Sequence, residues 1–216
     1  MPRRQPLTRD RVVAAAIDLA DHAGLDALSM RKLARELGVE AMSLYNHVTS
    51  KDDLLDGMVD AVVGEIAIPE PRPGEDWRLA MRRRADSAHA VLRRHPWATL
   101  PLVSRVNVGP NMLCYVDATI GCLRAAGFSW DLADRAWNAM DSHIYGFTLQ
   151  ELNFPFEPDA YREAARQYLP LIPEAEYPHL HGMTAEVLSG RHAGVHDFSF
   201  GLDLILDGLE GLRTRD

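Results

Sequence analysis

The sequence predicts an all-α protein, and three observations lead to this prediction. Apolar residues recur at intervals of three and four along most of the chain, no segment shows a convincing strand-like alternation, and N-capping residues precede several apolar runs. With 216 residues, of which 47% are hydrophobic and 25% charged, the chain is long enough for a real core and has the composition of an ordered protein.

The first predicted helix begins after Thr8, whose hydroxyl suits an N-cap, and Gly24 ends it. The spacing of its apolar residues gives one continuous stripe for burial. This stripe consists of Val12, Val13, Ala16, Ile17, Leu19, Ala20 and Ala23.

Residues 29–51 are the most informative stretch of the chain. Ser29 is expected to cap a second helix, Gly38 to supply a turn that needs a positive φ, and residues 40–46 to form a helix of barely two turns. Leu44 faces inward in this short helix, and because its nucleation is costly, packing must hold it. Two short helices joined by a tight turn are a layout for placing a helix N-terminus in a groove of DNA.

A capped helix leads away from this head. Ser50, followed three residues later by Asp53, resembles a capping box and opens a helix that runs to about Glu65. Residues 68–76 contain three prolines and one glycine, which predict a break in the chain. The break separates the head and its connecting helix from the remainder.

Beyond the break, helical periodicity predicts a body of further helices, with residues 96–110 irregular. Helices are expected over about residues 77–94, over about 111–126, over about 130–153 with Ser129 as the cap, as one or two short segments within 154–196, and from Ser199 onward.

The last helix carries more apolar surface than one neighbour needs. Its seam positions recur at alternating steps of four and three, and Leu204 and Leu206 lie off that seam. A homodimer interface would use this excess, and so would a helix buried within one chain; both possibilities stay open. The seam consists of Phe198, Leu202, Ile205, Leu209 and Leu212.

Charge is distributed unevenly along the chain. The net charge is −8, yet residues 1–51 contain eight basic and six acidic residues, so the negative excess lies in the remainder. A locally basic head on an acidic body fits a DNA-binding protein. No apolar run approaches the ~20 residues of a membrane span, and no secretory signal precedes the first helix. We therefore expect a cytoplasmic protein without a membrane partner.

The two cysteines are expected to be reduced core thiols rather than a disulfide. Cys114 and Cys122 lie eight residues apart on one predicted helix, which separates them by ~12 Å at the helical rise per residue. That distance is too long for a disulfide between them.

The segment LSMRKLARELGVEAMSLYNHVTSKDDLLDGM, residues 28–58, strongly resembles the DNA-binding head of the tetracycline repressor (TetR) family. The resemblance implies an all-α homodimer whose heads bind a palindromic operator and release it when a small organic inducer binds the body. It implies a helix-turn-helix head over residues 1–51, a connecting helix over 52–67 and a helical-bundle ligand-binding and dimerisation body over 68–216. Body segments that are similar to the tetracycline-repressor branch itself are 75–77, 126–129, 142–147, 200–205 and 208–210.

The expected contacts to double-stranded DNA lie on the head. The guanidinium of Arg31 suits a bidentate bond to guanine, Met42 suits a thymine methyl, and Ser43 suits a phosphate or a base. Other members of the set carry groups suited to phosphate oxygens, which fix register without reading sequence. For Arg31 and Asn46, simple solvent exposure is the alternative. The full set is Ser29, Arg31, Ala41, Met42, Ser43, Tyr45, Asn46, His47 and Lys51.

The resemblance raises the question of a metal. In the tetracycline branch the inducer arrives with a divalent metal held partly by histidines, and His143 and Glu151 match two of the positions involved. The other ligand histidine is missing just before Arg105, and Arg84 stands where a drug-binding asparagine is expected. A lone imidazole is a weak metal site, so we expect no metal, no cofactor and an effector other than tetracycline.

A mostly apolar, aromatic cavity with a few polar anchors is expected instead. Arg105 and His143 together would suit an anionic or carbonyl-bearing ligand. For each aromatic residue or methionine taken alone, core packing is the alternative. The candidate effector-binding residues are Trp97, Leu102, Arg105, Met112, Tyr115, Val116, Trp137, Met140, His143, Ile144 and Phe147.

Other classes of function compete with this prediction. The chain lacks the common hydrolase, nucleotide-binding and metalloprotease motifs, so we expect no enzyme and no catalytic residue. A DNA-binding regulator without a small-molecule inducer remains the alternative. A histidine group would suggest zinc, but Gly190 and Gly194 argue against a helix there, and a solvated loop is expected. The group consists of His179, His181, His192 and His196.

Overall fold

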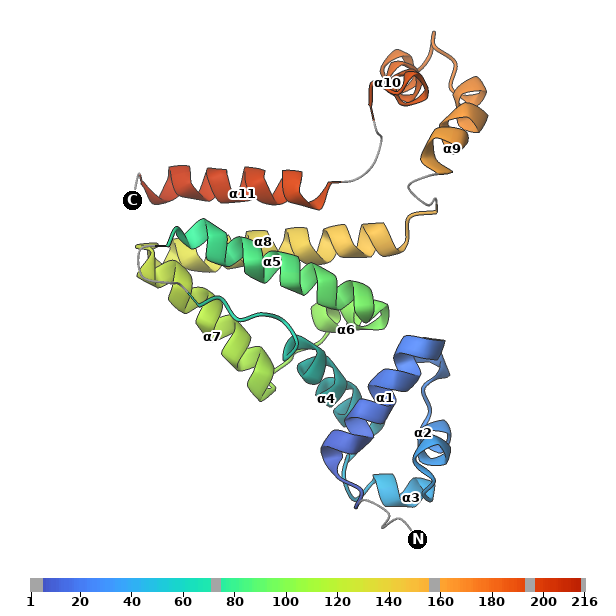
Figure 1. Ribbon diagram of the computed structural model, residues 1–216, viewed down its shortest axis with the longest axis vertical. Coiled ribbons are helices and arrows are strands. Elements are labelled where there is room, and N and C mark those ends of the chain that lie inside the picture. Colours follow the sequence, from blue (N-terminus) through green and yellow to red (C-terminus); the bar gives the residue numbers. More distant parts are fainter. Residues whose placement is uncertain (1–5, 71–74, 156–159, 193–196, 215–216) are drawn as a thin grey trace.

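A computed structural model describes residues 6–70, 75–155, 160–192 and 197–214. All regular structure in these residues is helical (Figure 1). The helices are α1 (Arg9–Ala23), η1 (Leu25–Ala27), α2 (Met30–Leu37), α3 (Ala41–Leu44), α4 (Lys51–Val63), α5 (Trp77–Arg94), η2 (Pro96–Ala98), α6 (Thr99–Ser104), α7 (Pro110–Ala125), α8 (Trp130–Leu152), α9 (Tyr161–Tyr168), η4 (Leu169–Leu171), α10 (Pro178–Ser189) and α11 (Phe198–Arg213).

The head begins and ends its helices where the capping residues predict. The hydroxyl of Thr8 accepts a hydrogen bond from the backbone N–H of Arg11, and Ser29 and Ser50 cap α2 and α4 in the same way. Gly38 ends α2 in the left-handed conformation, with φ +65°, which a side chain would resist. The predicted caps and the predicted turn are therefore confirmed.

A small core holds the head together and fixes the short α3. Val12, Leu33, Leu44 and Leu54 are fully buried and come from α1, α2, α3 and α4 respectively. Burying one such aliphatic side chain stabilises a fold by about 1.5–3 kcal/mol. This contribution, rather than helix propensity, keeps α3 in place.

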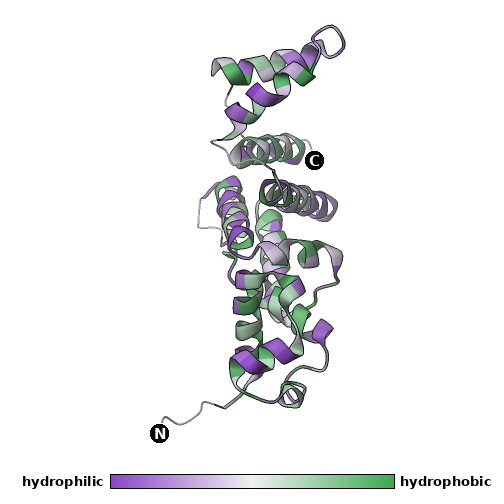
Figure 2. Cartoon of the chain, turned by 90° about the vertical axis from the view of Figure 1, so that its right-hand side faces the viewer, coloured by the Kyte–Doolittle hydropathy of each residue, from purple (hydrophilic) through white to green (hydrophobic). Residues whose placement is uncertain are grey.

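In the body, α5, α8 and α11 run side by side and α7 crosses them (Figure 1). Arg82 of α5 forms an ion pair with Asp203 of α11, and Trp77 packs edge-on against Phe128. The α9–α10 pair lies at one end of the molecule and the head at the other, and helices in both regions carry hydrophobic and hydrophilic residues (Figure 2). Of the described helices, none is long and apolar enough to span a membrane.

Two parts of the body differ from the sequence prediction. Residues 96–110, expected to be irregular, contain η2 and α6, and only 105–109 lack helix. The last helix begins at Phe198 with Asp197 as its cap, because the Asp197 carboxylate accepts from the N–H groups of Ser199 and Phe200. The remaining long helices lie within a residue or two of their predicted bounds.

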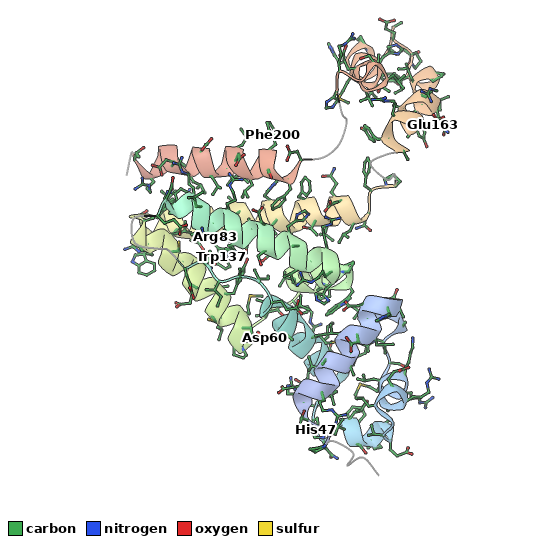
Figure 3. All side chains as sticks on the ribbon, in the orientation of Figure 1. His47, Asp60, Arg83, Trp137, Glu163 and Phe200 are labelled. Atoms are coloured by element: carbon green, nitrogen blue, oxygen red, sulfur yellow. The ribbon has the colours of Figure 1, made fainter. Side chains whose placement is uncertain are left out.

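The predicted seam of the last helix is split between two faces. Phe198, Leu202 and Leu209 are buried against the body together with Leu206, which was placed off the seam. Leu212 and Leu204 are exposed, as is Phe200. Figure 3 labels Phe200 on the side of α11 that faces away from α8. The buried positions therefore recur at steps of four, four and three, and the predicted seam position Ile205 is only half-buried.

Candidate nucleic-acid interface and ligand-binding core

The predicted DNA-binding residues lie at the N-cap of α2, on α2 and α3, in the loop after α3 and at the first residue of α4. These elements form the end of the molecule farthest from α9 and α10, where Figure 3 labels His47. Met42 is 75% exposed and Tyr45 45% exposed, which is unusual for large apolar side chains. Ser29, Arg31, Asn46 and Lys51 are also exposed, whereas Ala41, Ser43 and His47 are half-buried.

An ion pair between α1 and α4 holds the loop that follows α3, and so helps to orient the predicted DNA-binding surface. Arg9 of α1 donates to both carboxylate oxygens of Asp53 on α4 and to the backbone carbonyl of His47. The N–H of Thr49 donates to the same carboxylate at 2.6 Å. The Arg9 guanidinium and this N–H hold the pKa of Asp53 well below its usual range. The loop after α3 is therefore bonded to both α1 and α4.

The outer surface of the head retains unpaired cations. Among the described residues, Arg31, Arg35 and Lys51 have no ion-pair partner, although most arginines of the body do. Cations without a protein partner are available to phosphate oxygens. Arg3 and Arg4 lie outside the described residues.

The predicted effector residues come from η2, from α6 and the residue after it, from α7 and from α8. Tyr115, Met140 and Ile144 are packed in the core, Trp97 and Leu102 are buried, and the others are half-buried. Arg105 and His143, expected to act together, are bonded to different helices. Arg105 pairs with Asp56 and Asp52 of α4, at 2.8 and 3.3 Å, while His143 Nε2 lies 2.9 Å from the carbonyl of Phe198 and its ring stacks on that residue.

Further residues that the sequence singled out have contacts in the same region. Trp97 donates to Asp21 of α1 at 2.7 Å, so this side chain contributes to the joint between head and body. The carboxylate of Glu151 lies 2.7 Å from His89. Cys114 and Cys122 are free thiols, as predicted, but Cys114 is exposed rather than in the core.

The histidines expected in a solvated loop lie partly on a helix, because His179 and His181 belong to α10. His181 Nδ1 contacts the carbonyl of Ile172, α10 ends at Ser189 before His192, and His196 lies outside the described part of the chain. Over the described ranges, no three histidine, cysteine or acidic side chains lie together as metal ligands would.

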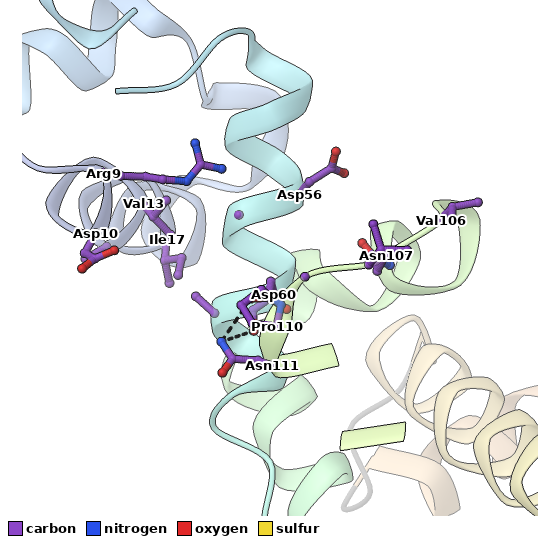
Figure 4. Close-up of a pocket in the computed structure, with 15 residues that line it drawn as sticks. Arg9, Asp10, Val13, Ile17, Asp56, Asp60, Val106, Asn107, Pro110 and Asn111 are labelled. Carbon is purple, nitrogen blue, oxygen red and sulfur yellow. Dashed lines mark hydrogen bonds between the residues drawn. The ribbon is translucent and has the colours of Figure 1, made fainter. Parts of the chain in front are cut away.

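The joint between head and body contains a cleft of about 650 Å³ (Figure 4). Asp60 of α4 lies beside it and accepts hydrogen bonds from the side chain of Asn111 and from the N–H of Met112. Gly109 is required at this point, because a Cβ there would lie 2.2 Å from Asp60 Oδ1. The connecting helix is therefore bonded directly to the start of α7.

A charged cluster in the core of the body was not predicted as a unit. Arg84 of α5 is fully buried, forms an ion pair with Asp141 of α8 and lies 4.6 Å from the ring centroid of Tyr115 on α7. The same carboxylate accepts from Trp137 Nε1 at 2.7 Å and from the Tyr145 hydroxyl at 3.1 Å. A signal for it exists in the sequence, since Arg84 falls within the apolar stripe of α5 formed with Ala80, Met81, Ala85 and Ala88.

Comparisons with known proteins agree with this arrangement. The family model "Bacterial regulatory proteins, tetR family" matches residues 12–58, and "Tetracyclin repressor-like, C-terminal domain" matches residues 70–213. An HTH-type transcriptional regulator of Saccharopolyspora erythraea is 38% identical over 83% of this chain and 76% of its own. The HTH-type transcriptional repressor DrrR1 of Streptomyces coeruleorubidus is 32% identical over 98% of this chain and 81% of its own.

Solved structures give the same answer for the fold. The TetR family protein ActR of Streptomyces coelicolor, in complex with (S)-DNPA, superimposes with a TM-score of 0.82 at 30% identity, covering 96% of this chain and 98% of its own. Another ActR structure is in complex with actinorhodin. These proteins are regulators rather than enzymes. The chain is therefore a member of the TetR family of bacterial transcriptional regulators.

Proposed function

We propose that this protein is a ligand-responsive transcriptional repressor that binds a palindromic operator as a homodimer and leaves it when a small organic effector binds the body. Residues 1–51 would contact DNA, residues 52–67 would transmit the signal, and residues 68–216 would bind the effector and form the dimer. The observation that carries the proposal is the exposure of Met42 on α3 and of Tyr45 directly after it, in a helix that buried Leu44 anchors.

The exposed residues of the head divide into two roles. Arg31, Met42 and Ser43 are suited to base edges, where they would read sequence. Tyr45, His47 and Lys51, with Ser29, are suited to phosphates and would set the position of the head on the duplex. Ala41 and Asn46 complete the surface that would enter the major groove.

The outward face of α11 supports a homodimer. Phe200 and Leu204 are 64% and 61% exposed, and they lie four residues apart on α11, on one side of the helix. An apolar patch of this kind on a folded protein is typical of an interface. Two-fold pairing through it would present two heads, and the half-sites would be about one helical turn of DNA apart or slightly more.

Release by an effector is supported by the relatives and by the joint. DrrR1 is a repressor, and ActR binds small molecules. An effector releases DNA only if it prefers the arrangement in which the heads do not fit the operator. The bonds from Asp60 of α4 to the start of α7 offer a path by which a change in the body would shift the connecting helix.

Gel shifts on the intergenic DNA upstream of the gene test the proposal. We expect retardation that candidate ligands relieve, and the product of the neighbouring, divergently read gene, such as an exporter or a modifying enzyme, would indicate the ligand class. Absence of retardation on any DNA would contradict the proposal. Retardation that no ligand relieves would favour a DNA-binding regulator without an inducer.

A further inference from the structure

The charged cluster at the meeting point of α5, α7 and α8 has more hydrogen-bond donors than acceptors. The Asp141 carboxylate accepts from three donors: Arg84 Nη2, Trp137 Nε1 and the Tyr145 hydroxyl. Arg84 uses only one of its nitrogens in this way. Its Nε and Nη1 are buried without a hydrogen-bond partner, and the hydroxyl of Tyr115 is buried beside Arg84 and Tyr145.

Such a surplus is unusual in a folded core. A guanidinium carries five N–H groups and no acceptor, and buried polar groups are nearly always paired because leaving them unpaired costs free energy. The guanidinium of Arg84 lies over the Tyr115 ring, which interacts favourably with its positive charge. The ring does not replace the missing hydrogen-bond acceptors. The cluster therefore lacks acceptor oxygens on the edge of the guanidinium away from Asp141.

The donors keep their protons near neutral pH. Burial raises the pKa of Tyr115 and of Tyr145, so both remain hydroxyls. Burial alone would lower the pKa of Arg84, but the charge of Asp141 and its hydrogen bond with Arg84 act in the opposite direction, and the pKa of Arg84 is raised. The surplus consequently persists across the physiological range of pH.

We infer that this cluster is the polar anchor of the effector site, and that it selects aromatic ligands carrying a carboxylate or another anionic oxygen. The inference rests on the proposed ligand-responsive function and names the ligand class. The acid would bind Arg84 Nε and Nη1 and accept from Tyr115, forming charge-assisted bonds. Its ring would replace core contacts between α5 and α7, close to half-buried Trp137, which Figure 3 labels beside these helices.

The position of Tyr115 connects such a ligand to the head. Tyr115 lies one turn after Asn111 and Met112, the two residues that donate to Asp60 of α4. A ligand inserted against Tyr115 would displace the first turns of α7, and the bonds to Asp60 would carry that displacement to the connecting helix. Anion binding and head position would then change together.

Two matched probes test the inference on DNA-free protein: 2-naphthoate and its neutral counterpart 2-naphthamide. Binding is followed by quenching of Trp137 fluorescence, with Trp137→Phe as the blank. We expect the native protein to bind naphthoate about tenfold or more tightly than naphthamide. The double variant Arg84→Met/Asp141→Asn, which removes both charges together, should lose this preference. Arg83→Met, on the exposed neighbouring arginine of α5, should keep it.

The Tyr115→Phe variant gives a second test in case the double variant does not fold. It deletes one hydroxyl and keeps the ring. It should weaken naphthoate binding several-fold and leave naphthamide binding unchanged. Failure of the native protein to bind naphthoate, absence of a preference for the acid, or a preference that persists in the double variant would overturn the inference. Because no DNA is present, these outcomes are independent of operator retardation, on which the proposed function depends.

Discussion

The carboxylate of Asp60 on α4 accepts a hydrogen bond from the backbone N–H of Met112 in the first turn of α7, at 2.9 Å. The amide of Asn111 donates to the same residue, to its carboxylate and its carbonyl (Figure 4). The first N–H groups of a helix have no partner within it, and a negative charge there is favourable. One side chain thus joins the connecting helix to the body.

Removing this carboxylate should destabilise the protein. We expect Asp60→Ala to lower the free energy of unfolding by about 1–3 kcal/mol, because it leaves the N–H of Met112 without its acceptor. Urea unfolding followed by circular dichroism measures the change. Gly109→Ala should act in the same direction, since its Cβ would displace the carboxylate. Asp10→Ala, on an exposed acid lining the same cleft, is the control, and an equal effect there would contradict this account.

Arg31→Ala should weaken binding to the operator by about 1–3 kcal/mol, which is the usual loss for a bidentate base contact. Stability should not change, because Arg31 is exposed and has no ion-pair partner among the described residues. Fluorescence anisotropy with labelled operator and thermal melting measure the two quantities. Arg135→Ala removes an exposed arginine of α8, remote from the head. If both variants lost affinity equally, Arg31 would have no specific role.

The head should lose stability in acid through Asp53. Its pKa is lowered in the folded protein by Arg9 and by the N–H of Thr49, so the unfolded chain binds the proton more readily. The contribution is therefore complete above the unfolded pKa of about 4 and is lost as the pH falls toward the folded value. Melting temperatures between pH 7 and pH 2.5 should show this decline.

Asp53→Asn tests the assignment of that decline. The variant should melt lower than the native protein at pH 7, and the difference should shrink as the pH falls. Asp26→Asn, on an exposed carboxylate of η1, should reproduce the native profile. A native-like profile for Asp53→Asn would show that other groups cause the acid sensitivity.

A charge on the outer face of α11 should dissociate the proposed homodimer. Phe200→Asp and Leu204→Asp place a carboxylate in an apolar interface, where an unpaired charge is costly. Sedimentation should give twice the mass of one 24.1 kDa chain for the native protein and one chain for each variant. Leu113→Asp, on an exposed leucine of α7, should remain dimeric. A native monomer would contradict the proposal.

Local sequence signals predicted most of the fold. The hydroxyls of Thr8, Ser29, Ser50 and Ser129 cap helices as expected, because a cap depends only on the residues that follow it. The α6 helix was not predicted because Pro101 lies within it and Pro110 lies shortly after it, and prolines usually indicate a break between helices.

The core of the candidate effector site was harder to predict because it depends on pairs far apart in the chain. Arg84 and Asp141 are 57 residues apart in the sequence, and Arg105 forms a hydrogen bond with Asp56, which is 49 residues away. Arg105 and His143 have the right chemistry for an acid, but tertiary contacts engage both elsewhere. Arg84 was noted only as a departure from a family pattern, although its place in an apolar stripe was the physical signal.

Binding of this protein to the DNA upstream of its own gene tests the central claim most directly. We predict that a labelled duplex of that region binds two chains, about a thousandfold or more tightly than a scrambled duplex of equal length. Affinity should fall steeply as salt rises, because phosphate contacts release counterions. Equal affinity for the two duplexes, or binding to neither, would contradict the account.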